Sequence, residues 1–379
     1  MTRESLPTPR ALEAQVLCWT VCLPLVPSVD LQLLTRASDD AVRLATDALD
    51  RHGWIERVTL HSADYGYAIE GYVLRTGAIP AFARAFGLDE TTFRRWFPVE
   101  HRDVLDRIAS FEVTDSVNRF LASVADELVE DGTARVLDLR ALPRRRAADR
   151  GWPPLMEAYG CIASLYVESF FVAWDRVAAP ATHRAARVSA WYRARGYHEW
   201  PTILIVCPGK VQRREWQRAI RISAYRRGVD SLDVAFTTTA EAFGQHPTGH
   251  CWRFPGEDDT VPLASVLRPV GTPLPSLPQP SRLDLVDRGV GTRTQTLPQW
   301  ASGVLASGCG SARERVAALR LTLRTAHRTA LSTLAHHPYL TPRDLPVVLR
   351  EDDGRVDRLL ADLERYDLVG SLTEAPLCP

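Results

Sequence analysis

The sequence predicts a mixed α and β protein, with a winged helix-turn-helix at each end and an α/β domain between them. Three observations predict this class. Two terminal segments share a repeat, strand-like and helical stretches alternate in the middle of the chain, and a proline-rich segment follows them. With 379 residues, the chain is long enough for two or three domains.

The repeat relates residues 30–55 to residues 344–369, an offset of 314 positions; Leu49, for example, corresponds to Leu363. In both copies a short helical stretch is followed by a polar break, a longer amphipathic helix and a strand-like tail. This is the layout of a helix-turn-helix with a wing. A chain that carries this unit at both ends is built to bind something large, such as DNA or another protein.

A winged helix is predicted for residues 1–88. Its expected elements are helices at 11–26, 29–36 and 39–52, and strands at 55–61 and 66–75. Asp39 and Asp40 can cap the third helix, and Gly53 can end it. The apolar residues of that helix recur at helical spacing, so one of its faces is expected to be buried.

Residues 89–132 are expected to form a helical connector, and residues 133–267 an α/β domain. The strand-like stretches are 134–142, 163–174, 202–207 and 234–238, with helical stretches at 181–195 and 210–226. Strands that alternate with helices predict a sheet that is at least partly parallel. The continuous apolar run from Ile203 to Val206 is typical of a central, buried strand.

Residues 268–310 are expected to be a linker followed by an irregular segment, since five prolines occur near its start. Residues 311–379 are the predicted C-terminal domain. A long helix is expected from Ser311 to about residue 335, and the second winged helix follows it. Pro342 is placed at the first position of a helix, where its missing N–H is tolerated.

Basic and acidic side chains balance at 46 each, so any contact with DNA must come from local patches. Lys210 is the only lysine, and a mechanism that needs a lysine therefore has one candidate. The seven cysteines form no Cys-x-x-Cys pair, so neither a zinc ribbon nor a thioredoxin-like motif is predicted, and their odd number fits a reducing cytoplasm. The apolar stretch 16–27 is too short to span a membrane. The motifs predict neither a metal nor a cofactor.

Several short segments accompany the order of winged helix, helical connector and α/β domain. They are 44–54, 72–77, 170–176, 187–192, 202–206 and 236–241, together with Trp252. With these segments, residues 12–268 resemble the replication-relaxation family of actinobacterial and plasmid-borne proteins. The resemblance implies a link to plasmid replication and DNA topology. It also implies a central domain similar to the restriction-endonuclease-like core.

The resemblance implies catalytic residues that this chain lacks. The strand near Phe171 should carry an acidic-x-Asp pair, but Ala173 stands at the first position and only Asp175 remains. A later helix should carry a lysine, and Arg187 is the best match for it. These departures predict a nuclease-like core that is catalytically degenerate.

The chemistry of strand cleavage leads to the same expectation. A metal-dependent nuclease needs converging carboxylates that hold Mg²⁺, and a lysine or its equivalent that positions the water. The chain has no acid-x-Lys motif, and Glu168 and Asp175 are expected on opposite faces of their strand. We therefore interpret Asp175, Glu168 and Arg187 as remnants without a catalytic role, and keep an active endonuclease as a minority alternative.

Positive charge is concentrated outside the predicted helix-turn-helix units. Both candidate recognition helices, 39–52 and 353–366, carry more acids than arginines, which is unfavourable in a groove lined by phosphates. They suit a protein partner or self-association at least as well. The candidate nucleic-acid-binding residues are Arg144, Arg145, Arg146, Lys210, Arg213, Arg214, Arg218 and Arg221. The alternative is that these side chains form an ordinary solvated surface.

Two functions from different classes are therefore predicted. The first is a catalytically degenerate, DNA-associated protein that binds DNA through its arginine-rich face and binds partners or itself through its winged helices. The second is a structural or adaptor subunit of a larger protein assembly, without DNA contact. Salt-dependent DNA binding separates the two.

Overall fold

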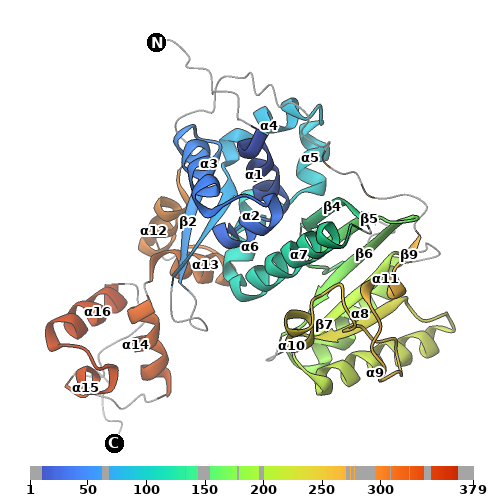
Figure 1. The fold of residues 1–379 in the computed structure, drawn as a ribbon. Coiled ribbons are helices and arrows are strands. Elements are labelled where there is room, and N and C mark those ends of the chain that lie inside the picture. The colour runs from blue at the N-terminus through green and yellow to red at the C-terminus, as the bar shows by residue number, and fades with distance from the viewer. Residues whose placement is uncertain are drawn as a thin grey trace, which may run out of the picture. The chain divides into compact units, whose positions relative to one another are not determined.

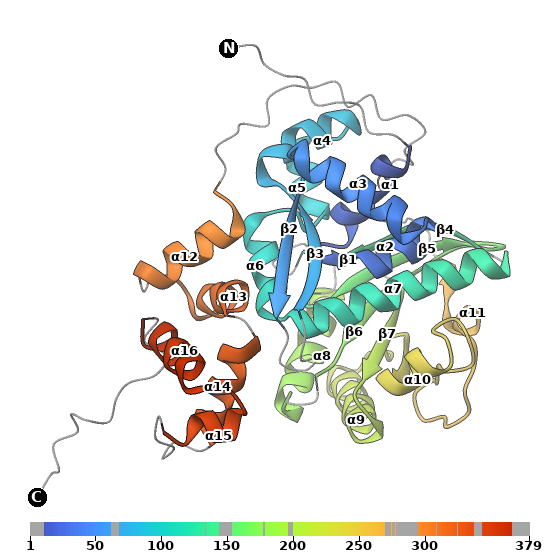
Figure 2. The ribbon, with the colours of Figure 1, turned by 60° about the vertical axis from the view of Figure 1, so that its left-hand side comes forward.

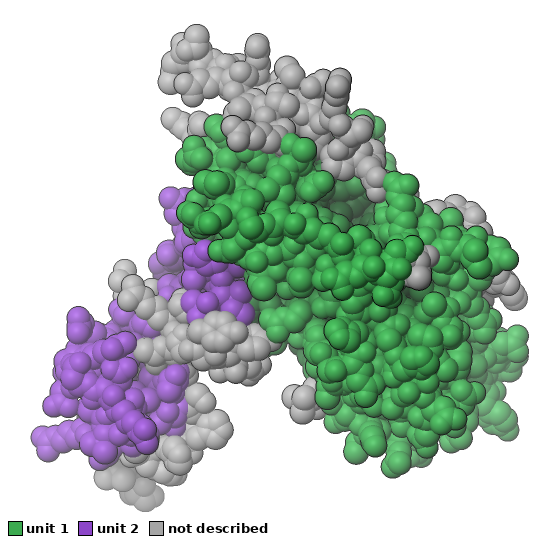
Figure 3. Space-filling view, viewed as in Figure 1, with its two compact units in different colours: residues 1–57, 71–294 green, residues 58–70, 295–379 purple. Residues whose placement is uncertain are grey.

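The structure is a computed structural model that describes residues 11–61, 68–132, 134–143, 154–176, 179–195, 200–269, 274, 277, 295–307, 309–323, 325–336 and 343–365. The mixed α and β class that the sequence predicts is confirmed, and the larger sheet is mixed as well. The chain divides into two compact units (Figure 3). The first comprises residues 1–57 and 71–294, and the second comprises residues 58–70 and 295–379.

The chain begins with three helices and a small sheet. The elements are α1 (Ala11–Cys22), β1 (Val26–Pro27), α2 (Ser28–Thr35), α3 (Asp39–Arg51), β2 (Ile55–His61) and β3 (Ala68–Leu74), and the sheet order is β1-β3-β2. Ser38 caps α3, so the prediction that Asp39 and Asp40 cap this helix is wrong, and both acids lie in its first turn. Gly53 follows the helix with a φ of 74°. The first helix is shorter than predicted, because Leu25 turns the chain at a φ of 68° and Val26 pairs with Tyr72 of β3.

Four helices follow β3, and the last three of them occupy residues 89–132, the segment predicted as a helical connector. The four helices are α4 (Ile79–Ala85), α5 (Glu90–Trp96), α6 (His101–Ala109) and α7 (Phe111–Asp131). A row of stacked rings joins α4 to α5, with the ring centroids of Phe82 and Phe93 5.1 Å apart. Gly132 ends α7 at a φ of 62°, a left-handed conformation that glycine adopts without strain.

The central sheet has the order β4-β5-β6-β7-β8. The short strand β9 pairs antiparallel with the start of β6, outside this order. The strands are β4 (Arg135–Ala141), β5 (Ala158–Ala163), β6 (Val167–Trp174), β7 (Thr202–Cys207), β8 (Val234–Thr238) and β9 (Arg268–Pro269). The pairs β4·β5 and β5·β6 are antiparallel, whereas β6·β7 and β7·β8 are parallel. The parallel strands are connected by α8 (Ala181–Arg195) and α9 (Lys210–Arg227). Two short helices, α10 (Thr239–Gly244) and α11 (Leu263–Val266), follow β8.

The sequence prediction of one strand over 163–174 is wrong at its start, because the chain turns there and β5 is a separate strand. The Ala-Tyr-Gly-Cys-Ile-Ala sequence of β5 contains a single β-branched residue, which is a weak strand signal. Gly160 is required by packing, since a Cβ at this position would lie 2.2 Å from Cζ of Phe170. That requirement comes from the neighbouring strand and is not visible in β5 itself.

Helices cover both faces of the central sheet (Figures 1 and 2). Phe170 and Val172 of β6 pack in one core with α7, and Phe171 and Ala173 pack in another with α8 and α9. Because successive strand residues point to opposite faces, this alternation is expected. The apolar run in β7 is central and fully buried, as predicted.

The compact units differ from the predicted domains. One apolar core extends from Val16 of α1 through Phe120 of α7 to Leu204 of β7. The predicted boundaries at residues 88 and 132 thus separate segments that share a core.

Within its described residues, the second unit contains residues 58–61 of β2, residues 68–70 of β3 and five helices. The helices are α12 (Leu297–Ser307), α13 (Ala312–Thr322), α14 (Thr325–His336), α15 (Leu345–Leu349) and α16 (Asp353–Arg365). The long helix predicted from Ser311 is divided in two, because Leu323 adopts an extended conformation. Pro342 lies outside the described residues.

The prediction that residues 283–310 are irregular is wrong for residues 297–307, which form α12. A capping box begins this helix. The N–H of Gln299 donates to Thr296 Oγ1, and the side chain of Gln299 accepts from the N–H of Thr296 at 3.0 Å. The Thr-x-x-Gln pattern is a helix-start signal in the sequence.

Three helices of the second unit repeat those at the start of the chain. α1 and α14 each have 12 residues, α3 and α16 each have 13, and the first and last residues of each pair are 314 positions apart. Arg36, which follows α2, and Arg350, which follows α15, both have a φ of 55°. The structure therefore extends the predicted repeat back to the first helix of each copy.

Candidate functional site

Two buried arginines of α8, each bound to carboxylates, occupy the end of β6, where the remnant candidates lie. Asp175 directly follows β6, and its side chain points to the face that carries α8 and α9. Arg184 of α8 donates from Nε to Asp175 Oδ2 at 2.6 Å and from Nη1 to Glu215 Oε2 of α9 at 2.6 Å. Asp175 Oδ1 accepts from the N–H of Arg176 at 2.9 Å. Both oxygens of Asp175 are thus engaged within the protein.

The second ion pair joins Arg187 of α8 to Glu157, the residue before β5, with 2.8 Å between Nη2 and Oε2. The same Glu157 oxygen accepts from the N–H of Trp174 at 2.9 Å. The guanidinium of Arg187 also lies over the rings of Trp191 and Trp216, which stack with their centroids 5.3 Å apart. Arg187 therefore stabilises the packing of α8 and α9 on the sheet.

These contacts decide what the end of β6 can do chemically. A carboxylate binds a divalent cation through lone pairs that are free to face it. Here Asp175 and Glu157 each bind a buried guanidinium, which is fixed in place and permanently charged. The arrangement is suited to holding α8 and α9 against the sheet. Among the described residues, His, Cys, Asp and Glu side chains form no group of three or more that is placed to hold a metal ion.

Glu168 lies apart from this cluster. It is near the start of β6, in register with Ile162 of β5, and Ser164 Oγ donates to its carboxylate at 3.3 Å. By the alternation of the strand it belongs to the face opposite Asp175. The structure thus brings Asp175 and Arg187 to the same end of the sheet and leaves Glu168 elsewhere.

Sequence reasoning missed Arg184 and Glu215, although α8 carried a signal for the first. Arg184 and Arg187 lie on the side of α8 that also bears the buried Val188 and Trp191. An arginine on the apolar face of a helix predicts a buried acid as its partner.

A stripe of exposed cations runs along α9, and we call it the α9 stripe. It consists of Arg214, Arg218 and Arg221, which recur at i, i+4 and i+7, and it begins next to exposed Lys210. No carboxylate of a described residue pairs with these three arginines. Tyr225 continues the stripe with 87% of its surface exposed. The α9 stripe thus exposes three guanidinium groups to solvent, and the aromatic ring of Tyr225 lies next to them along the helix.

Arg213 departs from the prediction that placed it on this exposed face. It is buried, with 5% of its surface exposed, and its Nη2 pairs with Asp258 at 3.0 Å. Asp258 belongs to the chain after β8, 45 positions away, so the helix itself does not show this inward orientation. Arg144, Arg145 and Arg146 lie outside the described residues.

The acidic residues of α3 are largely paired. Asp50 binds Arg75 at 2.9 Å, and Asp47 binds Arg57. These arginines come from β2 and from the residue after β3, so they offset the negative charge that the helix shows in isolation. Leu44 is 62% exposed on the outer face of α3.

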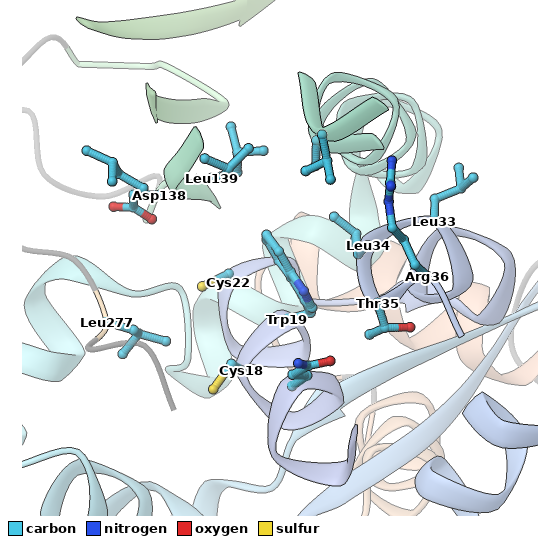
Figure 4. A pocket seen from close by; sticks show the side chains of 15 residues that line it. Cys18, Trp19, Cys22, Leu33, Leu34, Thr35, Arg36, Asp138, Leu139 and Leu277 are labelled. Carbon is cyan, nitrogen blue, oxygen red and sulfur yellow. The ribbon is translucent and has the colours of Figure 1, made fainter. Parts of the chain in front are cut away.

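The first unit also contains a cavity of about 380 Å³ between α1, α2, α7 and β4 (Figure 4). Its wall is mainly apolar and includes Trp19, Leu34 and Leu139. Asp138 also lines it, and burial raises the pKa of this carboxyl to about 6. Arg140 pairs with Asp138 at 3.3 Å. The cavity is large enough for a small apolar molecule.

Comparison of the chain with protein-family models, curated proteins and solved structures gives no match. A functional assignment for this chain therefore rests on the geometry of its described residues. Within those residues, no helix has the length and apolar character that crossing a membrane requires.

Proposed function

We propose that this chain is a DNA-associated protein of the replication-relaxation type, with a nuclease-like core that has lost its catalytic activity. The α9 stripe would contact the phosphate backbone, and the terminal helix units would bind a protein partner or a second copy. The observation that carries the proposal is the stripe itself, since it holds three exposed arginines at helical spacing with no carboxylate bound to them among the described residues. A DNA surface of this kind implies a cytoplasmic location.

The assignment of winged helices to both ends belongs to the same proposal. The element order α1-β1-α2-α3-β2-β3, with a three-stranded sheet, supports it for residues 11–75. At the other end, the helices α14, α15 and α16 support it by their correspondence with α1, α2 and α3. Both recognition helices carry more acids than arginines, which favours protein contacts for these units, although Arg57 and Arg75 pair with two of the acids of α3.

Reversing the charge of the stripe is expected to weaken DNA binding strongly. In Arg214→Glu/Arg218→Glu/Arg221→Glu, three phosphate contacts are lost and three repulsive charges are added. The slope of log K against log [salt] is expected to fall by about 3, since each contact releases roughly one counterion. The measurement is a titration of labelled duplex DNA at low and at physiological salt.

A matched control carries the same change of net charge elsewhere. Arg95, Arg102 and Arg315 are exposed residues of α5, α6 and α13, so Arg95→Glu/Arg102→Glu/Arg315→Glu should retain most of the binding. Equal loss in both triple variants would show that net charge, not the stripe, governs the affinity. Absence of binding by the wild type would favour the adaptor function.

The degenerate core gives a second expectation. Supercoiled plasmid incubated with the protein and Mg²⁺ or Mn²⁺ should stay uncut, because Arg184 and Arg187 hold the carboxylates that a metal would need. The readout is the fraction of nicked circles on a gel. Nicking that disappears in Asp175→Ala, but persists in Glu168→Gln, would instead assign the core an active site.

A further inference from the structure

The helices α1–α3 and α14–α16 are two copies of one three-helix unit, so a contact that is present in one copy and absent from the other can be identified by position. Core positions correspond, since Leu31 matches Leu345 and Val42 matches Val356, and each of the four has at most 1% of its surface exposed. The helix starts correspond as well. Ser38 accepts from the N–H of Ala41, and 314 positions later Asp352 accepts from the N–H of Arg355. The correspondence therefore holds residue by residue.

In the N-terminal copy, α7 covers the outer face of α2 (Figures 1 and 2). Leu34 lines the same cavity as Ala125 and Val129 of α7. Arg36, in its left-handed conformation, donates from Nη2 to the carbonyl oxygen of Asp126 at 2.9 Å and to the carboxylate of that residue at 3.2 Å. An amphipathic helix thus supplies both an apolar contact and an acid to the end of α2.

In the C-terminal copy, the equivalent face is exposed. Val347 and Val348 correspond to Leu33 and Leu34, and they are 81% and 48% exposed. Arg350 is also exposed, and no carboxylate of a described residue pairs with it. We call these three residues the α15 face. Two exposed valines beside a cation in a left-handed conformation reproduce what α2 presents to α7.

We propose that the α15 face docks an amphipathic helix of a partner protein, with apolar side chains against the valines and a carboxylate on Arg350. A helix is the expected occupant because the equivalent face in the same chain binds one. An acid is expected because Arg350 has the backbone conformation in which Arg36 reaches Asp126. The chain's own α7 cannot serve, since all its apolar residues except Val129 are already buried in the first unit.

The test uses a labelled peptide with the sequence of residues 111–131 as a surrogate for the partner helix. Its fluorescence anisotropy is followed as the full chain is added. Wild type is expected to bind, and Val347→Asp/Val348→Asp is expected to bind at least about 10-fold more weakly, because the apolar contact is lost. Since these side chains are exposed, the variant should keep the circular dichroism spectrum of the wild type.

Exchanging the charges of Arg350 and its peptide partner distinguishes a specific contact from nonspecific hydrophobic binding. The Arg350→Glu variant should bind the natural peptide more weakly than wild type does. A peptide that carries Asp126→Arg should bind this variant and so restore the affinity. Failure of wild type to bind at high micromolar concentration would overturn the proposal, as would equal binding by the valine variant. Self-association of the free chain that depends on Val347 would replace the partner helix with a second copy, and would overturn it too.

Discussion

Replacing Arg184 with methionine is expected to lower the free energy of unfolding by about 3–5 kcal/mol. Arg184 and Asp175 have side chains that are 2% and 1% exposed, and their ion pair is 2.6 Å long. Removing the guanidinium leaves a buried carboxylate without its counterion. Glu215, with 37% of its side chain exposed, can turn towards water, so most of the loss is assigned to Asp175. Urea denaturation of both proteins measures the difference.

The double variant Arg184→Met/Asp175→Asn is the control. Because it removes both charges, it should recover a large part of the stability lost in the single variant. A loss below about 1 kcal/mol in Arg184→Met would contradict the ion pair as a structural element. Equal instability of the single and double variants would show that packing of the arginine, not its charge, is what the fold requires.

Replacing Asp30 with asparagine is expected to stabilise the protein at pH 8 by roughly 2–4 kcal/mol. Asp30 of α2 is 1% exposed. Burial, followed by repulsion from Asp115 of α7, raises the pKa of its carboxyl to about 7, although Arg119 opposes this. In the unfolded chain the same carboxyl titrates near 3.8. Between these two values the folded protein holds a proton that the unfolded chain has released.

The direction of the pH effect comes from this difference. The free energy of unfolding of the wild type should fall as pH rises from about 4 to about 7, and this contribution should be constant above that range. Asp30→Asn removes the contribution, so the two proteins should be equally stable near pH 4 and differ most at pH 8. Denaturation at pH 4, 6 and 8 gives the comparison. Asp131→Asn, at an exposed acid of α7, should show no such divergence.

The parts of the fold that the sequence predicts best are those with local causes. The helix α3 ends just before Gly53 and has apolar residues at helical spacing, and both features are predicted from the sequence, whereas its cap is Ser38 and not the predicted Asp39 or Asp40. The apolar run of β7 is similar, since a strand with helices on both faces has no polar side. The repeat adds independent support, because the same pattern gives the same helices twice.

The parts that the sequence does not predict depend on distant partners. The strand β5 needs a glycine because of a ring on β6. Arg213 turns inward because of Asp258, and the acids of α3 are offset by Arg57 of β2 and by Arg75, which follows β3. In the candidate site, helical spacing alone predicts the exposed stripe of α9. The pairing of Arg184 with Asp175 requires the sheet and α8 to be placed first.

The left-handed arginines imply a tension between stability and recognition. A residue with a side chain loses roughly 1–2 kcal/mol in this conformation, whereas glycine adopts it freely. Glycine at position 36 or 350 would therefore remove the backbone strain at that position, but it would also remove the positive charge of the arginine. For Arg36 the contact with Asp126 compensates within the chain. For Arg350 the proposed partner helix would supply the equivalent contact, so occupation of the α15 face is expected to stabilise the C-terminal unit.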